Sequence, residues 1–202
     1  LIIVMGVVPN LGYISITPMV GLTIIHIPVF IGAYFGGRKV GASLGLVFGI
    51  TSFLVALTRP TGLLDPVFTN PLVSILPRVL VGYFAVDVLN FFKNKVKVGY
   101  LADALYFGSM TLIHSLLVIP LIYVVAKTGF YFDVYGLLST FLSEQAGEAI
   151  VVTSENTLGV IAYVSDYFIL GTGFFGFLMT IVIVNSLLEI VGCVLIGTPI
   201  SK

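Results

Sequence analysis

The sequence contains few charged residues and a single cysteine. Only 9% of its 202 residues are Asp, Glu, Lys or Arg, and nine acidic and nine basic side chains give a net charge of zero. A soluble domain carries about 25% charged residues, because water must solvate its surface. A chain this apolar therefore fits a lipid environment. The lone Cys193 excludes an intrachain disulfide framework and a thiolate metal cluster, and without a basic excess we expect no nucleic-acid partner.

Several catalytic and transport motifs are also absent. There is no G-x-x-x-x-G-K-[ST] loop, so the chain has no Walker-type ATP site. Neither H-E-x-x-H nor G-x-S-x-G occurs, which argues against a zinc or serine intramembrane protease. An ion channel would need charge rings or a repeated filter sequence, and the chain has neither. We expect no cofactor, no metal and no catalytic residue, and a transport function would take its ATP hydrolysis from partner proteins.

Apolar residues make up 58% of the chain and are gathered in long runs. At roughly 20 residues per span, the length allows about six spans and no large soluble domain. We therefore expect an all-α integral membrane protein, a six-transmembrane-helix bundle in which residues 1–202 form one domain. The chain starts at Leu1 and its first apolar run ends at Pro9, so we expect the first helix to begin before this sequence. The predicted helices cover about 1–8, 19–35, 40–57, 70 to the basic stretch at 93–97, 101–126 and 163–197, with a weakly amphipathic piece at 137–150 before the last.

Successive connections between the predicted helices lie on opposite sides of the membrane, and lysine and arginine are divided unevenly between the two sides. Only Arg59 and Lys127 fall in one set. The positive-inside rule places the more basic set in the cytoplasm. We therefore expect a multi-pass protein of the cell membrane with both termini cytoplasmic. The basic set consists of Arg38, Lys39, Lys93, Lys95, Lys97 and Lys202.

A glycine recurs every four residues along the third predicted helix, at Gly37, Gly41, Gly45 and Gly49. This spacing places the four on one face, where another backbone can approach closely. Two interpretations are open. The face packs within the bundle, or it offers a smooth, partner-facing surface to another subunit.

Polar side chains inside the predicted helices are candidate binding residues, because each is costly in lipid. Asn70, Ser74 and Arg78 are spaced by four and share one face of the fourth helix. The guanidinium of Arg78 cannot deprotonate and must find an anion or several carbonyls. It could bind a ligand carboxylate or phosphate in a bidentate pair. Alternatively, it pairs with Glu189 or another acid, or extends toward the membrane surface.

Further candidates lie on three other helices. A histidine inside a helix bundle is often a hydrogen-bonded packing residue, so His26 and His114 could have this structural role instead of binding a ligand. Asn185 offers an amide donor and acceptor together, and Glu189, one turn later, could be a counter-ion. The predicted substrate-binding set is Arg78, Asn185, Ser74, Asn70, His114, His26, Thr111 and Glu189.

Four segments resemble the substrate-binding S components of energy-coupling factor (ECF) transporters. Residues 23–33 (TIIHIPVFIGA) and 41–49 (GASLGLVFG) resemble their second and third helices. Residues 70–82 (NPLVSILPRVLVG) resemble the fourth, and 185–190 (NSLLEI) resembles the N-x-x-x-E segment of the last. The resemblance covers nearly the whole chain in order and spacing. It is greatest to the pantothenate-specific members, especially over residues 65–78.

The resemblance implies a vitamin-binding subunit of an ABC-type importer in the bacterial plasma membrane. Such subunits capture the vitamin outside, work with a transmembrane coupling (T) subunit and two cytoplasmic ATPases, and topple in the membrane to release it inward. Connections at about 9–18 and 58–69 would cover the site. Pantothenate carries a carboxylate, hydroxyls and an amide, which Arg78, Asn185 and His114 could match.

Other functions stay open from the sequence. The vitamin could instead be a hydroxymethylpyrimidine, riboflavin or folate, since those sites also need polar residues and the chain has ample aromatic side chains for stacking a flavin. A small membrane scaffold would use the glycine face only to assemble a complex. An intramembrane enzyme would need His26, His114 and Glu189 to converge on one point.

Overall fold

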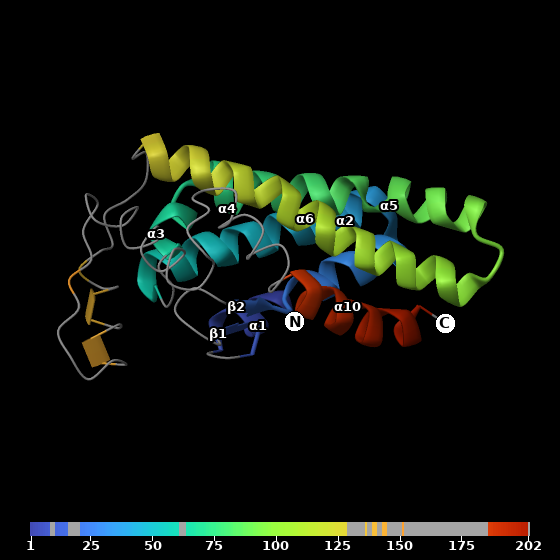
Figure 1. Ribbon diagram of the computed structural model, residues 1–202, viewed down its shortest axis with the longest axis horizontal. Helices are drawn as coiled ribbons and strands as arrows, with labels where there is room; N and C mark the ends of the chain where they lie inside the picture. The colour runs from blue at the N-terminus through green and yellow to red at the C-terminus, as the bar shows by residue number, and fades with distance from the viewer. Residues whose placement is uncertain are drawn as a thin grey trace, which may run out of the picture.

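The computed structural model describes residues 1–8, 11–15, 21–60, 64–128 and 186–201, together with isolated positions at 136, 139–140, 143–144 and 151. The long helices lie side by side along the longest axis, with α10 against α6 and α1 against α2 (Figure 1). In chain order the elements are α1 (Ile2–Val7), β1 (Tyr13–Ser15), β2 (Gly21–Thr23), α2 (His26–Thr58), α3 (Asp65–Phe68), α4 (Pro71–Ser74), α5 (Leu76–Lys95), α6 (Gly99–Thr128) and α10 (Leu187–Ile200).

Three helical segments of the described part are long and apolar enough to cross a membrane, namely His26–Thr58, Pro71–Lys95 and Gly99–Val125. Their outer faces expose large apolar side chains such as Leu54 and Leu116, which suits contact with lipid. The chain is therefore a helical, multi-pass membrane protein. Most residues from 129 to 185 lie outside the described part, including the predicted amphipathic piece and the first two thirds of the last predicted helix.

Helix α2 reverses its direction at Gly37. This residue has φ 78° and ψ −173°, a conformation that glycine adopts without a steric penalty. Beyond it, the Leu44 side chain returns to Gly32, although a straight helix would hold the two about 18 Å apart. The element therefore consists of two antiparallel limbs, residues 26–36 and 38–58. They are the second and third predicted helices, and the predicted break between them is confirmed.

The second predicted helix begins later than expected. It starts at His26 rather than 19, and residues 21–23 form a strand that pairs antiparallel with β1. The prediction of a helix from 19 was wrong over residues 21–23, and β1 lies within the connection predicted at about 9–18. Pro28 has no N–H to donate and fits the first helical turn, so it favours a helix start just before it. The β-branched residues of the stretch 23–25 favour extended backbone.

The fourth predicted helix is present as α4 and α5, which are separated by Ile75. Its predicted start is confirmed, because the Asn70 Oδ1 accepts a hydrogen bond from the Leu72 backbone N–H (2.8 Å) and Pro71 occupies the first helical position. Helix α6 covers the predicted fifth helix, and α10 carries the end of the last one on to Ile200.

The glycine face of the 38–58 limb packs against α5 inside the chain. A Cβ on Gly45 would lie 2.2 Å from the carbonyl oxygen of Arg78, and one on Gly41 would lie 2.2 Å from that of Gly82. Gly49 similarly faces the start of α5, and α2 and α5 form the most extensive contact in the described part. For these three glycines the structure shows internal packing rather than a partner-facing surface, and Gly37 serves the reversal.

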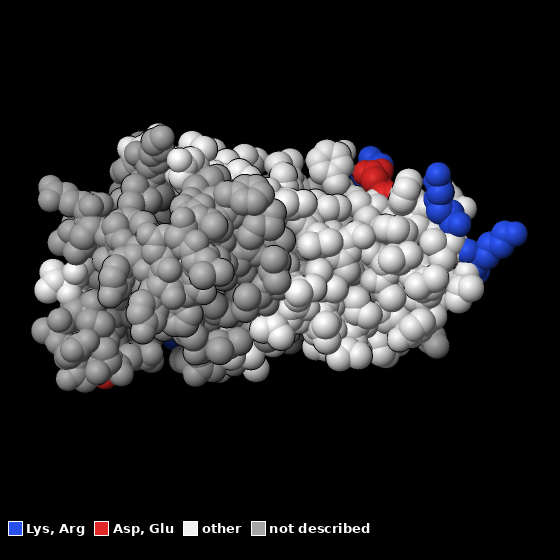
Figure 2. All heavy atoms as spheres, viewed as in Figure 1, with Lys and Arg blue, Asp and Glu red and all other residues white. Residues whose placement is uncertain are grey.

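Positive charge gathers at one end of the bundle, the right-hand end in Figure 2. There Arg38 pairs with Asp87, and the Lys93 Nζ lies 2.6 Å from Oδ1 of the buried Asp103. Ser201, after α10, donates to the other oxygen of Asp103 (3.1 Å). The α2 reversal, the α5–α6 connection and the end of α10 thus meet at the basic end, as the division of lysines and arginines predicted.

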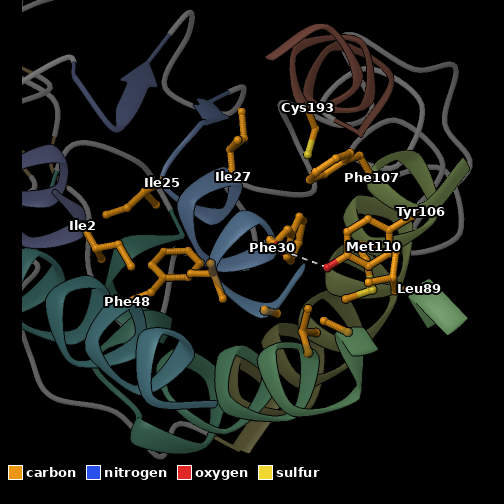
Figure 3. Close-up of a cluster of buried hydrophobic side chains, with 14 residues drawn as sticks. Ile2, Ile25, Ile27, Phe30, Phe48, Leu89, Tyr106, Phe107, Met110 and Cys193 are labelled. Atoms are coloured by element: carbon orange, nitrogen blue, oxygen red, sulfur yellow. Dashed lines mark hydrogen bonds between the residues drawn. The ribbon is translucent and has the colours of Figure 1, made fainter. Parts of the chain in front are cut away.

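The core between the helices is strongly aromatic (Figure 3). Phe30, Phe48, Tyr106 and Phe107 are each at most 1% exposed. The Tyr106 hydroxyl donates to the Phe30 carbonyl oxygen at 2.9 Å, so its one polar group is satisfied inside the core. This packing fixes α6 against the first limb of α2, and it places the polar residues described next.

Candidate functional site

Arg78 is the only buried lysine or arginine among the side chains that the structure describes, with 5% of its surface exposed. It lies in the first turn of α5, directly after Pro77. Pro77 has no N–H to donate to the carbonyl of Val73, and the Nη1 of Arg78 donates to that carbonyl instead. The Pro-Arg sequence thus folds the guanidinium back along its own helix.

Two phenyl rings flank this guanidinium. The Cζ of Arg78 lies 5.4 Å from the ring centre of Phe48 on α2 and 5.1 Å from that of Phe68 on α3. Aromatic faces attract a cation, but they leave N–H groups without acceptors. The Nε of Arg78 is buried and has no hydrogen-bond partner in the described part of the chain. An unused donor on a buried cation is costly, so the position favours a carboxylate or phosphate ligand.

Phe48 connects Arg78 to a pair of histidines. The ring centre of His114 lies 5.9 Å from that of Phe48 and 5.7 Å from that of His26. The His26 Nδ1 and His114 Nε2 are buried, and the described residues offer neither a hydrogen-bond partner. The term polar cage is used below for the group formed by Arg78, Phe48, His114 and His26. Its unused nitrogens can bind the polar groups of a small ligand.

Thr111 contacts one ring nitrogen of His26 and leaves the other unused. Its Oγ1 donates to the Phe107 carbonyl oxygen (3.1 Å) and lies 3.5 Å from the His26 Nε2. A hydroxyl has one proton, so with respect to His26 it must accept. This contact fits the tautomer with the proton on Nε2, which leaves the Nδ1 as an acceptor for a ligand hydroxyl or amide N–H.

Asn70 and Ser74 support the turn that leads to Arg78. Asn70 caps α4, and the Ser74 hydroxyl donates to the Asn70 carbonyl oxygen at 3.0 Å. Both residues are buried. The predicted shared face of Asn70, Ser74 and Arg78 therefore lies inside the bundle, with the first two engaged in local hydrogen bonds.

Glu189 lies on α10 and is 7% exposed. Its Oε1 accepts a hydrogen bond from the backbone N–H of Thr23 at 2.8 Å. Within the described residues it forms no ion pair with Arg78 and no hydrogen bond with His26 or His114. The arrangement that an intramembrane enzyme would need is therefore not found there. Asn185, four residues earlier, lies outside the described residues.

Sequence reasoning missed three aromatic residues at this site, namely Phe48, Phe68 and Tyr13. Phe48 holds Arg78 and His114 from one side, Phe68 flanks the guanidinium, and the Tyr13 ring lies 6.5 Å from Phe48. The only available signal was the place of Phe48 directly before Gly49, on the limb that carries the glycine face.

Comparison with known proteins adds two findings. The family model described as "ECF transporter, substrate-specific component" matches residues 1–201. The pantothenic acid transporter PanT of Lactococcus lactis subsp. cremoris (strain MG1363) is 34% identical over 95 residues, which are 41% of this chain and 48% of that protein. The match thus spans about half the length of this relative.

Proposed function

Because the chain belongs to the family of ECF transporter substrate-specific components, we propose that it captures a vitamin from outside the cell and that this vitamin is pantothenate. The partial likeness to a pantothenic acid transporter supports this choice. The observation that carries it is Arg78, a buried cation with an unused donor beside two histidines with unused nitrogens.

The groups of pantothenate match the polar cage in chemical kind. Its carboxylate would pair with the Arg78 guanidinium and offset the cost of burying that charge. Its amide and hydroxyls would bond to the His26 Nδ1, which accepts, and to the His114 Nε2. The Phe48 ring offers an apolar surface between these groups. The ligand would thus satisfy polar atoms that the described residues leave without partners.

The charge of Arg78 favours pantothenate over two of the other vitamins. Hydroxymethylpyrimidine and riboflavin carry no carboxylate and would leave the guanidinium without an anion. Folate carries carboxylates, so the cage alone does not separate it from pantothenate. The likeness to a pantothenic acid transporter favours pantothenate here.

The transport cycle follows from family membership rather than from contacts in this chain. We propose a single six-helix domain in the bacterial plasma membrane, with the basic end and both termini in the cytoplasm. The chain would associate with a T subunit and two ATPases and would topple to release the vitamin inward. The absence of a Walker motif supports an external source of ATP hydrolysis.

The direct test is calorimetry on the purified chain with pantothenate, hydroxymethylpyrimidine, riboflavin and folate. We expect heat of binding for pantothenate alone. Binding of another vitamin would retain a vitamin-binding subunit and reject pantothenate as its substrate. If a folded sample bound none of the four, the proposal would fail and a scaffold role would take its place.

A further inference from the structure

A single buried carboxylate ties the β1–β2 hairpin to α10. The Glu189 Oε1 accepts the backbone N–H of Thr23 at 2.8 Å, across 166 positions of sequence. Glu189 is 7% exposed, so water competes little for this hydrogen bond. The strand end at Thr23 is therefore held firmly to α10.

The same strand end lies directly opposite a residue of the site. In the two-stranded ladder, Thr23 pairs with Tyr13. The Tyr13 ring stands 6.5 Å from the ring of Phe48, which in turn contacts Arg78 and His114. Cross-strand neighbours move together, because their Cα atoms are only about 5 Å apart. A continuous series of contacts thus runs from Glu189 through Thr23 and Tyr13 to the polar cage.

Tyr13 and Ile24 of the hairpin region pack against the aromatic core, and backbone contacts add to this packing in the described part. The Ile24 N–H donates to the Gly12 carbonyl oxygen (2.9 Å), which is a bond within the hairpin region itself. Gly12 packs against the backbone of Met5 on α1, where a Cβ would lie 2.4 Å from the Met5 oxygen. Neither contact joins the hairpin to α10. That connection is the bond to Glu189.

We propose that Glu189 is a positioning residue: its carboxylate holds β2, and through the Thr23–Tyr13 pair it keeps Tyr13 against Phe48 at the polar cage. Loss of the acceptor releases Tyr13 from the cage. The consequence for ligand exchange rests on the proposed function, since a released hairpin would let the bound vitamin leave faster. The effect on the position of Tyr13 can be measured without a ligand.

The ligand-independent test uses tryptophan fluorescence. The chain has no tryptophan, so Tyr13→Trp introduces a single tryptophan, which can be excited at wavelengths that the remaining tyrosines do not absorb. In that background, Glu189→Ala is expected to shift the emission to longer wavelength, whereas Glu189→Gln, which retains an acceptor oxygen, keeps the parent spectrum. Leu188→Ala, at an exposed neighbour on α10, is the matched control. Identical spectra for the Ala and Gln variants would overturn the proposal.

A second variant separates the effect of the hydrogen bond from that of the charge, and a structural check accompanies it. Glu189→Asp retains the charge but shortens the side chain, so its oxygen no longer reaches the Thr23 N–H, and we expect it to behave as Glu189→Ala does. Circular dichroism of each variant checks that helix content is unchanged. A red shift in Ala but a parent-like spectrum in Asp would show that charge, not the hydrogen bond, holds the hairpin, and would also reject the proposal.

The ligand-dependent test measures the dissociation rate of pantothenate. Both Glu189→Ala and Glu189→Gln remove the negative charge near Arg78, and Gln retains an acceptor oxygen that Ala lacks. Dissociation is expected to be roughly tenfold faster in Ala than in Gln, as for loss of one buried hydrogen bond between neutral groups. Equal rates would contradict the positioning role. If the wild type bound no pantothenate, the proposed function would fail, while the fluorescence test would still decide the role of Glu189.

Discussion

At the scale of single residues, the guanidinium of Arg78 is positioned before any ligand arrives. The Val73 carbonyl, left free by Pro77, fixes one end, and Phe48 and Phe68 flank its plane. A group that is already ordered loses little conformational entropy on binding. The uncompensated charge is costly to the empty protein, and a bound carboxylate would remove that cost. The same buried charge therefore destabilises the empty protein and makes the site selective for an anion.

Thr111 is a residue whose hydroxyl can be removed with almost no change in shape. Thr111→Val would leave the His26 Nε2 buried without its hydrogen-bond partner, and such a group costs about 1–3 kcal/mol. We expect the variant to unfold at lower temperature, as measured by the thermal melt in detergent. Thr58→Val is the control, because the Thr58 hydroxyl donates only to the Leu54 carbonyl on an exposed surface. Equal melting temperatures for the two variants would argue against the His26–Thr111 contact.

At the scale of elements, the position of Arg78 depends on the close approach of α2 and α5. Gly45 touches the Arg78 carbonyl, and Gly41 and Gly82 face one another across the same contact. Small residues at such crossings let van der Waals packing and backbone proximity hold helices together in lipid. The limb that carries the glycines also carries Phe48, so the same contact brings the ring against the guanidinium.

Gly45→Ala should therefore push α2 and α5 apart. Its Cβ would lie 2.2 Å from the Arg78 carbonyl oxygen, which belongs to backbone and cannot rotate away. We expect a loss of about 3 kcal/mol of unfolding free energy, as for overpacking of a tight core. Gly192→Ala is the matched control, since nothing lies within 4 Å of a Cβ there and alanine favours the helix. Denaturant titration that gave both variants the same stability would contradict the packing described.

The elements also show which parts of the fold the sequence could predict. The break at Gly37 and the cap at Asn70 were predictable, because each rests on a local residue preference. The strand at 21–23 was not, because a short apolar run next to a helix start has no period that separates strand from helix. The place of Glu189 could not be derived either, since its partner Thr23 belongs to that unpredicted strand.

The site was predictable in its charged residue and not in its aromatic ones. Arg78 stands out in any apolar helix, because a buried guanidinium needs a partner. The chain holds 16 phenylalanines, so no local feature selects Phe48 and Phe68 as its neighbours. Their role follows from the packing of α2 and α3 on α5, which joins residues far apart in sequence. Asn185 stays a prediction, as it lies outside the described residues.

At the scale of the whole molecule, polarity is divided along the bundle. The surface that faces lipid is apolar, positive charge gathers at one end (Figure 2), and the one buried cation in the described part lies within the helices. An exposed cation at the basic end keeps its hydration, whereas Arg78 cannot. This division suits the proposed function, in which a chain embedded in the membrane binds an anionic small molecule inside its helices.

We propose above all that Arg78 recognises the carboxylate of pantothenate. The most direct test is a thermodynamic cycle by calorimetry, with pantothenate and panthenol, its alcohol analogue without a carboxylate, against the wild type and Arg78→Ala. Wild type is expected to favour pantothenate by about 3 kcal/mol, as for a buried charge pair that loses one partner. Arg78→Ala is expected to bind the two compounds almost equally. An unchanged preference for pantothenate in Arg78→Ala would show that another group binds the carboxylate and would contradict the account.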